Sequence, residues 1–228
     1  MSQQTTIPVI QDRRANPVIR FVLRLRSELL LLYFVLMLLL SPLADQDRHA
    51  AFAIAVLVAL ALLAGVSYMA RGRIVSLVVL PVAGIWFVAR WVEIYTDERY
   101  HIAPVIGLVL SCAVIWGITS RFGTVPKIST GVISEAIIVY LVIAVAFSQV
   151  YWIMNRAFDH CFNVAVPLAQ SSTLLYFSLV TITTVGYGGV APVNPYVRLV
   201  AGFEAVVGLF YISIAVARLV AAYRPDSI

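Results

Sequence analysis

Long apolar runs constrain this chain more than any other feature of its sequence. A run of about 20 residues can cross the roughly 30 Å of hydrocarbon in a bilayer. Such runs occur at 28–44, 50–70, 74–95, 102–120, 133–154 and 194–223. Of the 228 residues, 62% are hydrophobic and 12% are charged, which is typical of an integral membrane protein. We therefore expect an all-α membrane protein with six transmembrane helices.

The basic residues indicate how these spans are oriented. Cytoplasmic flanks of membrane helices carry an excess of Lys and Arg, and with the amino terminus inside, eleven of the sixteen basic residues fall in cytoplasmic segments. Both termini are then cytoplasmic, in a plasma membrane or a prokaryotic inner membrane. No Asn-x-Ser/Thr site occurs, which favours a prokaryotic or unglycosylated protein. Nucleic-acid binding is not expected, because the basic residues are dispersed over several loops.

The first 26 residues contain five arginines and two prolines. They are predicted to form a cytoplasmic arm. Apolar residues interleave with arginines between positions 18 and 26, so the arm could lie on anionic lipid as an amphipathic helix. A solvated tail that obeys the positive-inside rule is an equal alternative. The basic start and the first apolar run also resemble a cleavable signal peptide.

The stretch from Thr184 to Gly188 reads Thr-Val-Gly-Tyr-Gly. Gly186 and Gly188 lack a Cβ, so they can adopt the left-handed conformations that turn successive backbone carbonyls to the same side. Val185 and Tyr187 would then point their side chains away from the carbonyls. Four such loops around one axis replace the hydration shell of a potassium ion with rings of oxygens. The motif therefore predicts K⁺ binding from Thr184 to Tyr187.

Residues 133 to about 223 resemble the pore domain of the tetrameric potassium channel superfamily. The matching features are an apolar helix, a short re-entrant segment at 172–183, the filter, Pro192, and a second apolar helix with Gly208 twenty residues after Gly188. The resemblance implies a re-entrant pore helix and a homotetramer around a central pore, since one filter per chain cannot close a ring.

Several residues are expected to support this filter. The resemblance implies that the aromatic pair of the pore helix forms a cuff around the filter, and Ser171 or Ser172 can cap the start of that helix. The expected support residues are Tyr176, Phe177, Val180, Thr181, Thr183 and Gly189.

Two of these positions depart from the family's pattern. The family usually has Asp after the last filter glycine, where this chain has Gly189; some members have Glu four residues before the filter threonine, where it has Val180. The filter is therefore expected to lack a carboxylate clamp. We expect a more mobile outer mouth, with altered inactivation or looser selectivity.

The four spans before the pore unit do not follow the pattern of a voltage sensor. A sensor carries arginines at every third position of its fourth helix, whereas residues 102–120 contain no charge. Gly107 in this span permits a kink or a close helix contact. The predicted domains are a basic arm (1–26), a peripheral four-helix domain (27–120), a cytoplasmic linker (121–132), the pore domain (133–223) and a short cytoplasmic tail (224–228).

The function expected from the filter is passive, potassium-selective conduction without classical voltage gating, with permeant K⁺ and no cofactor. The alternative is a non-conducting or weakly selective channel-like subunit with a scaffold or regulatory role, although all five filter residues are intact. An enzyme is not expected, because His49, His101 and His160 fall in external loops and form no catalytic constellation.

Glu204 is the one carboxylate deep in an apolar span. An isolated charge there costs at least a few kcal/mol, so Glu204 is expected to be hydrogen-bonded, protonated or paired, with Arg198 as a candidate partner. Its role is either structural, bonded to the pore helix, or that of a proton sensor.

The last span is expected to contain the gate. Aligned from Gly208, the resemblance places Leu209, Ile212, Val216 and Val220 toward the axis, on one helical face. We expect a hydrophobic constriction at Ile212 to Val216 that closes by expelling water, hinged at Gly208. The same stripe could instead pack against the preceding span. If the stripe forms the gate, the helix is expected to pack through its other bulky residues, Phe210, Tyr211 and Ile214.

The two cysteines are not expected to pair within the chain. Cys112 falls inside a span, and Cys161 falls in the external loop at 155–170, the turret. An intrachain disulfide would therefore join a membrane-buried residue to an external one. Turrets of neighbouring copies could pair through Cys161, but a free thiol is favoured. Asp159 and His160 precede it without further ligands nearby, so no metal site is expected.

Overall fold

The computed structural model describes residues 17–47, 49–57, 73–96, 102–122, 130–164 and 171–222. Within these ranges the secondary structure is helical, apart from one isolated antiparallel bridge between Phe162 and Pro192. The helices are α1 (Pro17–Ala44), α3 (Arg73–Thr96), α4 (Ile102–Phe122), α5 (Thr130–Ala157), α6 (Ser171–Ile182) and α7 (Pro195–Ala222). Residues 49–57 are also helical.

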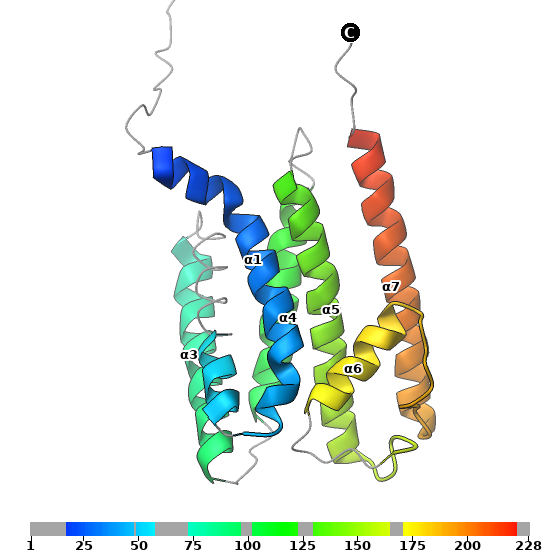
Figure 1. The fold of residues 1–228 in the computed structure, drawn as a ribbon. Coiled ribbons are helices and arrows are strands. Elements are labelled where there is room, and N and C mark those ends of the chain that lie inside the picture. Colours follow the sequence, from blue (N-terminus) through cyan, green and yellow to red (C-terminus); the bar gives the residue numbers. More distant parts are fainter. Residues whose placement is uncertain are drawn as a thin grey trace, which may run out of the picture.

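The long helices run side by side, and the short helix α6 lies obliquely between α5 and α7 (Figure 1). Helices α1 and α4 pack on α5, and α3 packs on α4. The start of α1, the end of α4, the start of α5 and the end of α7 lie at one end of the bundle (Figure 1). The loop after α5 and the start of α7 lie at the opposite end (Figure 1).

Three of the described helices are long and apolar enough to cross a membrane. They are Ile102–Ser120, Gly131–Ala157 and Pro195–Arg218, with mean hydropathies of 2.2, 2.2 and 2.1. Shorter apolar helices occur at Leu30–Ala44, Pro81–Val92 and Ser172–Ile182. The chain is therefore an all-α membrane protein, as expected, and three of the six predicted spans meet the full length in the described part. Most of the predicted span at 50–70 lies outside it.

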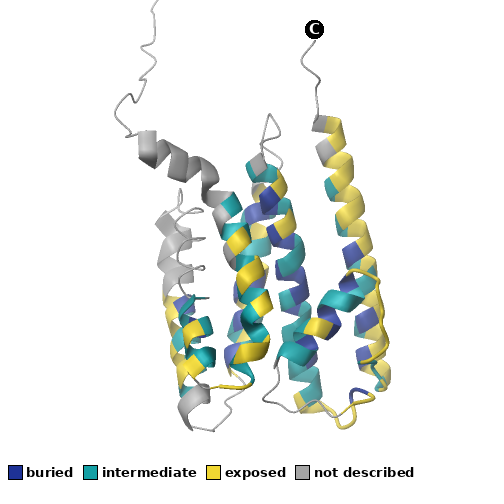
Figure 2. Ribbon diagram, in the orientation of Figure 1, coloured by how far each residue is buried: buried dark blue, intermediate teal, exposed yellow. Residues whose placement is uncertain are grey.

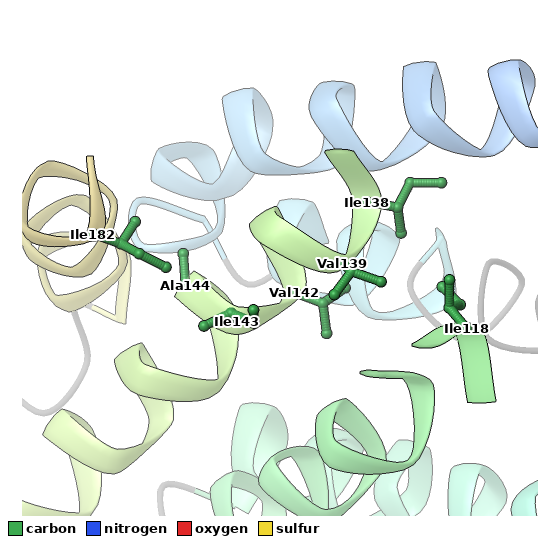
Figure 3. Close-up of a cluster of buried hydrophobic side chains, with 7 residues drawn as sticks. All are labelled: Ile118, Ile138, Val139, Val142, Ile143, Ala144 and Ile182. Carbon is green, nitrogen blue, oxygen red and sulfur yellow. The ribbon is translucent and has the colours of Figure 1, made fainter. Parts of the chain in front are cut away.

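Helix α5 is at the centre of the buried core. One cluster of buried side chains links α5 to α4 on one side and to α6 on the other (Figure 3). Its members are Ile118, Ile138, Val139, Val142, Ile143, Ala144 and Ile182. Small and β-branched side chains let α5 approach its neighbours closely. The core thus ties the end of α6 to the peripheral helices.

The close approach expected at Gly107 is confirmed. A Cβ added there would lie 2.3 Å from Oε1 of Gln149 on α5, so a larger residue would require the end of that side chain to move. Gly107 therefore marks a close contact between α4 and α5.

The boundary predicted between the amino-terminal arm and the first span is not a break in the helix. Helix α1 begins at Pro17 and continues to Ala44. Proline is favoured at the first helical position because its missing N–H would have no partner there. The first turns of α1 lie at an angle to the rest of it (Figure 1). The predicted arm before residue 17, most of the predicted linker and the predicted tail lie outside the described residues.

Candidate functional site

Helix α6 starts at a cap supplied by a distant part of the chain. Asp45, which follows α1, accepts a hydrogen bond from the backbone N–H of Ser172 at 3.2 Å and another from the Ser172 hydroxyl. A carboxylate at this position satisfies N–H groups of the first turn and interacts favourably with the helix dipole. Asp45 and Ser172 are 127 residues apart, and no local pattern in the sequence signals the contact.

The carboxyl end of α6 folds directly into the Thr184–Gly188 loop. The carbonyl oxygen of Val180 accepts hydrogen bonds from the N–H groups of Val185 at 3.1 Å and Gly186 at 3.3 Å. The hydroxyls of Thr181 and Thr183 bond back to carbonyls four residues earlier, at 2.7 and 2.6 Å. The backbone of Val180 therefore holds the loop, at a position where some relatives use a glutamate side chain.

Alternate residues of this loop are left-handed. The φ angles are +59° at Gly186 and +82° at Gly188, as predicted, and also +59° at Thr184. A β-branched residue rarely adopts this conformation because it strains the backbone. Residues with strained backbone occur most often at functional sites. Left-handed residues at every second position are the arrangement that the carbonyl argument requires. Nothing in the sequence indicates that Thr184 would share it.

One side of the loop is uncovered within a single chain. Residues 183–189 are all exposed, and the side chains of Val185 and Tyr187 keep 52% and 75% of their surface. Of the expected aromatic pair, Tyr176 is exposed and Phe177 is buried. The ring of Phe177 lies 4.9 Å from that of Tyr151. Phe177 therefore belongs to the core of its own chain, and Tyr176 faces outward.

The turret braces the segment that follows the loop. Asn163 exchanges two hydrogen bonds with Ala191: its backbone N–H donates to the Ala191 carbonyl at 2.9 Å, and its side-chain oxygen accepts from the Ala191 N–H at 2.7 Å. The Asn163 amide also donates to the carbonyl of Gly189 at 3.4 Å. A turret amide thus holds the outer end of the loop where the family usually has a carboxylate.

A comparison with family models agrees with this geometry. Residues 135–224 match a model described as "Ion channel". This match supports a likeness of these residues to the pore-loop ion channel superfamily. The family is one of transport proteins rather than enzymes. Neither the curated proteins nor the solved structures gave a match.

The junction of α6 and the Thr184–Gly188 loop is packed tightly against α7. The carbonyl of Ile182, the last residue of α6, accepts the Tyr140 hydroxyl at 2.9 Å. A Cβ added at Gly208 would lie 2.4 Å from the same carbonyl oxygen. Gly208, which the resemblance marks as a hinge, is therefore also a point of close approach between two elements of the pore domain.

Glu204 is completely buried behind the pore helix of this domain. Its Oε2 accepts the hydroxyl of Tyr151 on α5 at 2.6 Å, and its Oε1 contacts the hydroxyl of Ser178 on α6. Arg198 is exposed and forms no described ion pair with it. The predicted pairing of Glu204 with Arg198 is wrong, because a hydroxyl contacts each of the two carboxyl oxygens of Glu204. Whether Glu204 responds to protons stays a prediction.

The expected gate residues lie on an exposed helix face of the pore domain. Leu209, Ile212, Val216 and Val220 keep 61%, 46%, 52% and 69% of their surface. The residues to which packing was assigned do not all pack, because Phe210 and Ile214 are exposed as well. Of these three residues, Tyr211 packs: its ring stacks on Tyr140 at 5.8 Å and its hydroxyl donates to the Ala136 carbonyl at 2.7 Å.

The turret cysteine is enclosed. Cys161 keeps 2% of its surface, and its thiol donates to the carbonyls of Met154 and Phe158 at 3.4 Å. Burial, together with the nearby Asp159 carboxylate, raises the pKa of the Cys161 thiol. A disulfide between turrets would first have to expose this side chain. The structure thus favours the free thiol.

Proposed function

We propose that four copies of this chain form a potassium-selective channel whose filter is Thr184–Gly188. The observation that carries the proposal is the left-handed backbone at Thr184, Gly186 and Gly188, in a loop that leaves the end of a pore helix. Alternating left-handed residues present successive carbonyls on one side, which is what a ring of oxygens around a dehydrated K⁺ needs. The permeating ion is the only ligand that this proposal requires.

The proposed assembly follows from the solvation of the filter backbone. Non-helical backbone at membrane depth is tolerated only where protein or a water-filled cavity covers it, and residues 183–189 are exposed within one chain. Further copies would supply that cover. Helix α7 is exposed along most of its length (Figure 2), so it has a large apolar surface for its neighbours and for lipid. A ring of four satisfies the filter and closes the assembly.

The proposed orientation puts both termini in the cytoplasm of a cell with the channel in its plasma membrane, which for a prokaryote is the inner membrane. The distribution of arginines supports it. The start of α1 and the end of α7 lie at the same end of the bundle (Figure 1), as the proposal requires. The basic stretch around the start of α1 would then face anionic lipid headgroups.

Ion flux into liposomes tests the proposal. Purified protein in K⁺-loaded vesicles should support barium-sensitive uptake of rubidium and much less of sodium. Gly186→Ala should abolish the flux, because alanine in a left-handed conformation is strained by roughly 1–2 kcal/mol in each copy. Gly202→Ala is the matched control, since Gly202 lies on α7 with no atom within 4 Å of an added Cβ.

Two results would contradict this function. Equal sodium and potassium fluxes in the wild-type protein would refute selectivity. A folded, tetrameric protein that carries no flux under varied pH and voltage would favour the alternative of a non-conducting channel-like subunit.

A further inference from the structure

Glu204 joins the three helices of the pore domain at one buried point. The Tyr151 hydroxyl of α5 reaches one carboxyl oxygen at 2.6 Å, and the Ser178 hydroxyl of α6 reaches the other. Ser178 also lies 2.7 Å from the carbonyl oxygen of Ala144 on α5. Glu204 and Ser178 are both 0% exposed, so water does not compete for these contacts.

The number of protons available decides whether all of these contacts can be hydrogen bonds. Three oxygens lie in a row: the Ala144 carbonyl, the Ser178 hydroxyl and one Glu204 oxygen. A carbonyl only accepts, and a hydroxyl has a single proton to donate. If Glu204 were ionised, one of the two contacts of Ser178 would bring two acceptors together without a proton. A neutral Glu204 removes the conflict, because it donates to Ser178, which donates to Ala144.

Among the residues that the structure describes, no positive charge near the carboxyl favours its ionisation. The groups that act on it are the hydroxyls of Ser178 and Tyr151. The phenol of Tyr140 on α5 lies within electrostatic range. From the turret, the Cys161 thiol belongs to the same buried cluster as Tyr151. On α7, Arg198 is exposed. Within the described chain, the cluster is thus neutral when Glu204 is protonated. When Glu204 is ionised, the cluster contains a buried charge without an opposite partner.

We propose that Glu204 is held as the neutral acid and that its proton positions the pore helix, so that losing the proton loosens the filter. The route is short. Ser178 is two residues from Val180, whose carbonyl holds the N–H groups of Val185 and Gly186. An ionised Glu204 would recruit the Ser178 proton away from Ala144 and draw in water. Glu204 is therefore a positioning residue of the proposed channel, acting through α6.

Glu204→Gln is the decisive variant. A glutamine can donate from its amide to Ser178 and accept from Tyr151, so it reproduces every contact of the neutral acid and cannot ionise. The variant should fold and melt like the wild type at neutral pH. Failure to fold would overturn the inference, because the amide supplies the same donors and acceptors. Glu204→Leu, which removes the contacts, should melt at a lower temperature.

Infrared difference spectroscopy tests the proton without reference to conduction. The folded wild-type protein should show the carbonyl band of a protonated carboxylic acid at neutral pH, and Glu204→Gln should lack that band. Raising the pH should lower the melting temperature of the wild type more than that of Glu204→Gln, since an ionised carboxylate is better solvated in the unfolded chain. Absence of the band in folded wild-type protein would overturn the inference.

Flux measurements test the coupling, which rests on the proposed function. Alkaline pH should reduce the preference for K⁺ over Na⁺ by about fivefold in the wild type, the effect of losing one neutral hydrogen bond, and leave Glu204→Gln unchanged. The same pH response in both proteins would overturn the coupling. If the wild-type protein conducts no ions, the proposed function fails, while the infrared and melting results still decide the state of Glu204.

Discussion

Replacing Gly208 by alanine tests the close contact between the last helix and the filter junction. The added Cβ would lie 2.4 Å from the Ile182 carbonyl oxygen and 2.6 Å from Cγ1 of the same residue. Real Cβ atoms do not approach other atoms this closely, so something has to move. The carbonyl is not free to do so, because it also accepts the Tyr140 hydroxyl at 2.9 Å. The substitution therefore pushes α7 away from both α6 and α5.

Overpacking of this kind costs about 1–3 kcal/mol in each copy, equivalent to a factor of roughly 5–150 in the folding equilibrium. Alanine also gains about 1 kcal/mol over glycine in helix propensity, which offsets part of the loss. Gly202→Ala separates the two effects. Gly202 lies on the same helix as Gly208, but a Cβ added there meets no atom within 4 Å. The difference in unfolding free energy between the two variants is then the cost of the contact.

Thermal denaturation in detergent measures that difference. Gly202→Ala should melt at or above the wild-type temperature, and Gly208→Ala should melt lower, by about 2–4 °C per kcal/mol for a chain of this size. Adding Ile182→Ala should not rescue Gly208→Ala, because the backbone oxygen remains. The reasoning is refuted if the two glycine variants melt together. A hinge role alone would give that result, with an altered fraction of open channels instead.

Four further predictions concern the other supports of the filter, the gate and the turret. Asn163→Leu removes two neutral hydrogen bonds to the segment after the filter, worth about 1 kcal/mol each, and should speed the loss of K⁺ selectivity in flux at low K⁺; unaltered selectivity would show that the turret is not a clamp. Asp45→Ala removes a cap of α6 worth about 0.5–2 kcal/mol and should lower the melting temperature; an unchanged melting temperature would contradict the cap. Val216→Asp should hydrate the proposed constriction and give leak current without a stimulus; a folded tetramer as closed as the wild type would argue against a gate there. Because the pKa of Cys161 is raised and only the thiolate reacts, its alkylation should be slower in folded than in denatured protein at neutral pH and accelerate at a higher pH; equal rates would contradict its burial.

The features that sequence could predict are those with a local cause. Apolar runs specify membrane helices because every backbone group must be satisfied within the segment. The left-handed backbone of the Thr184–Gly188 loop could be predicted at its glycines, because glycine permits this conformation whatever the surroundings. Gly186 and Gly188 behave as expected. Thr184 does not follow from that logic, since a β-branched residue is strained there and the surrounding fold must impose the conformation.

The supports of the filter were missed because they are tertiary. Tyr140 and Ile182 are 42 residues apart, and Tyr151 and Glu204 are 53 apart. Each donor is an ordinary tyrosine in an apolar helix, where the default interpretation is an interfacial or packing residue. Periodicity alone could not place a gate on the last helix, because a stripe of apolar residues does not show whether it faces lipid, a neighbouring copy or water. Phe210 and Ile214 show this, being as exposed as the expected gate residues.

Val180 and Gly189 stand where relatives have carboxylates. Their presence changes which groups hold the proposed filter, and the loop is still held. The described supports are neutral: a backbone carbonyl at Val180, the Asn163 amide and the Tyr140 hydroxyl. Such groups do not titrate near neutral pH, so they give the outer mouth no proton dependence. Any proton dependence of the filter must then come from behind the pore helix, where Glu204 lies. Introducing Gly189→Asp would place a titratable group at the mouth itself, and a response to external pH in this variant beyond that of the wild-type protein would show that the native clamp is neutral.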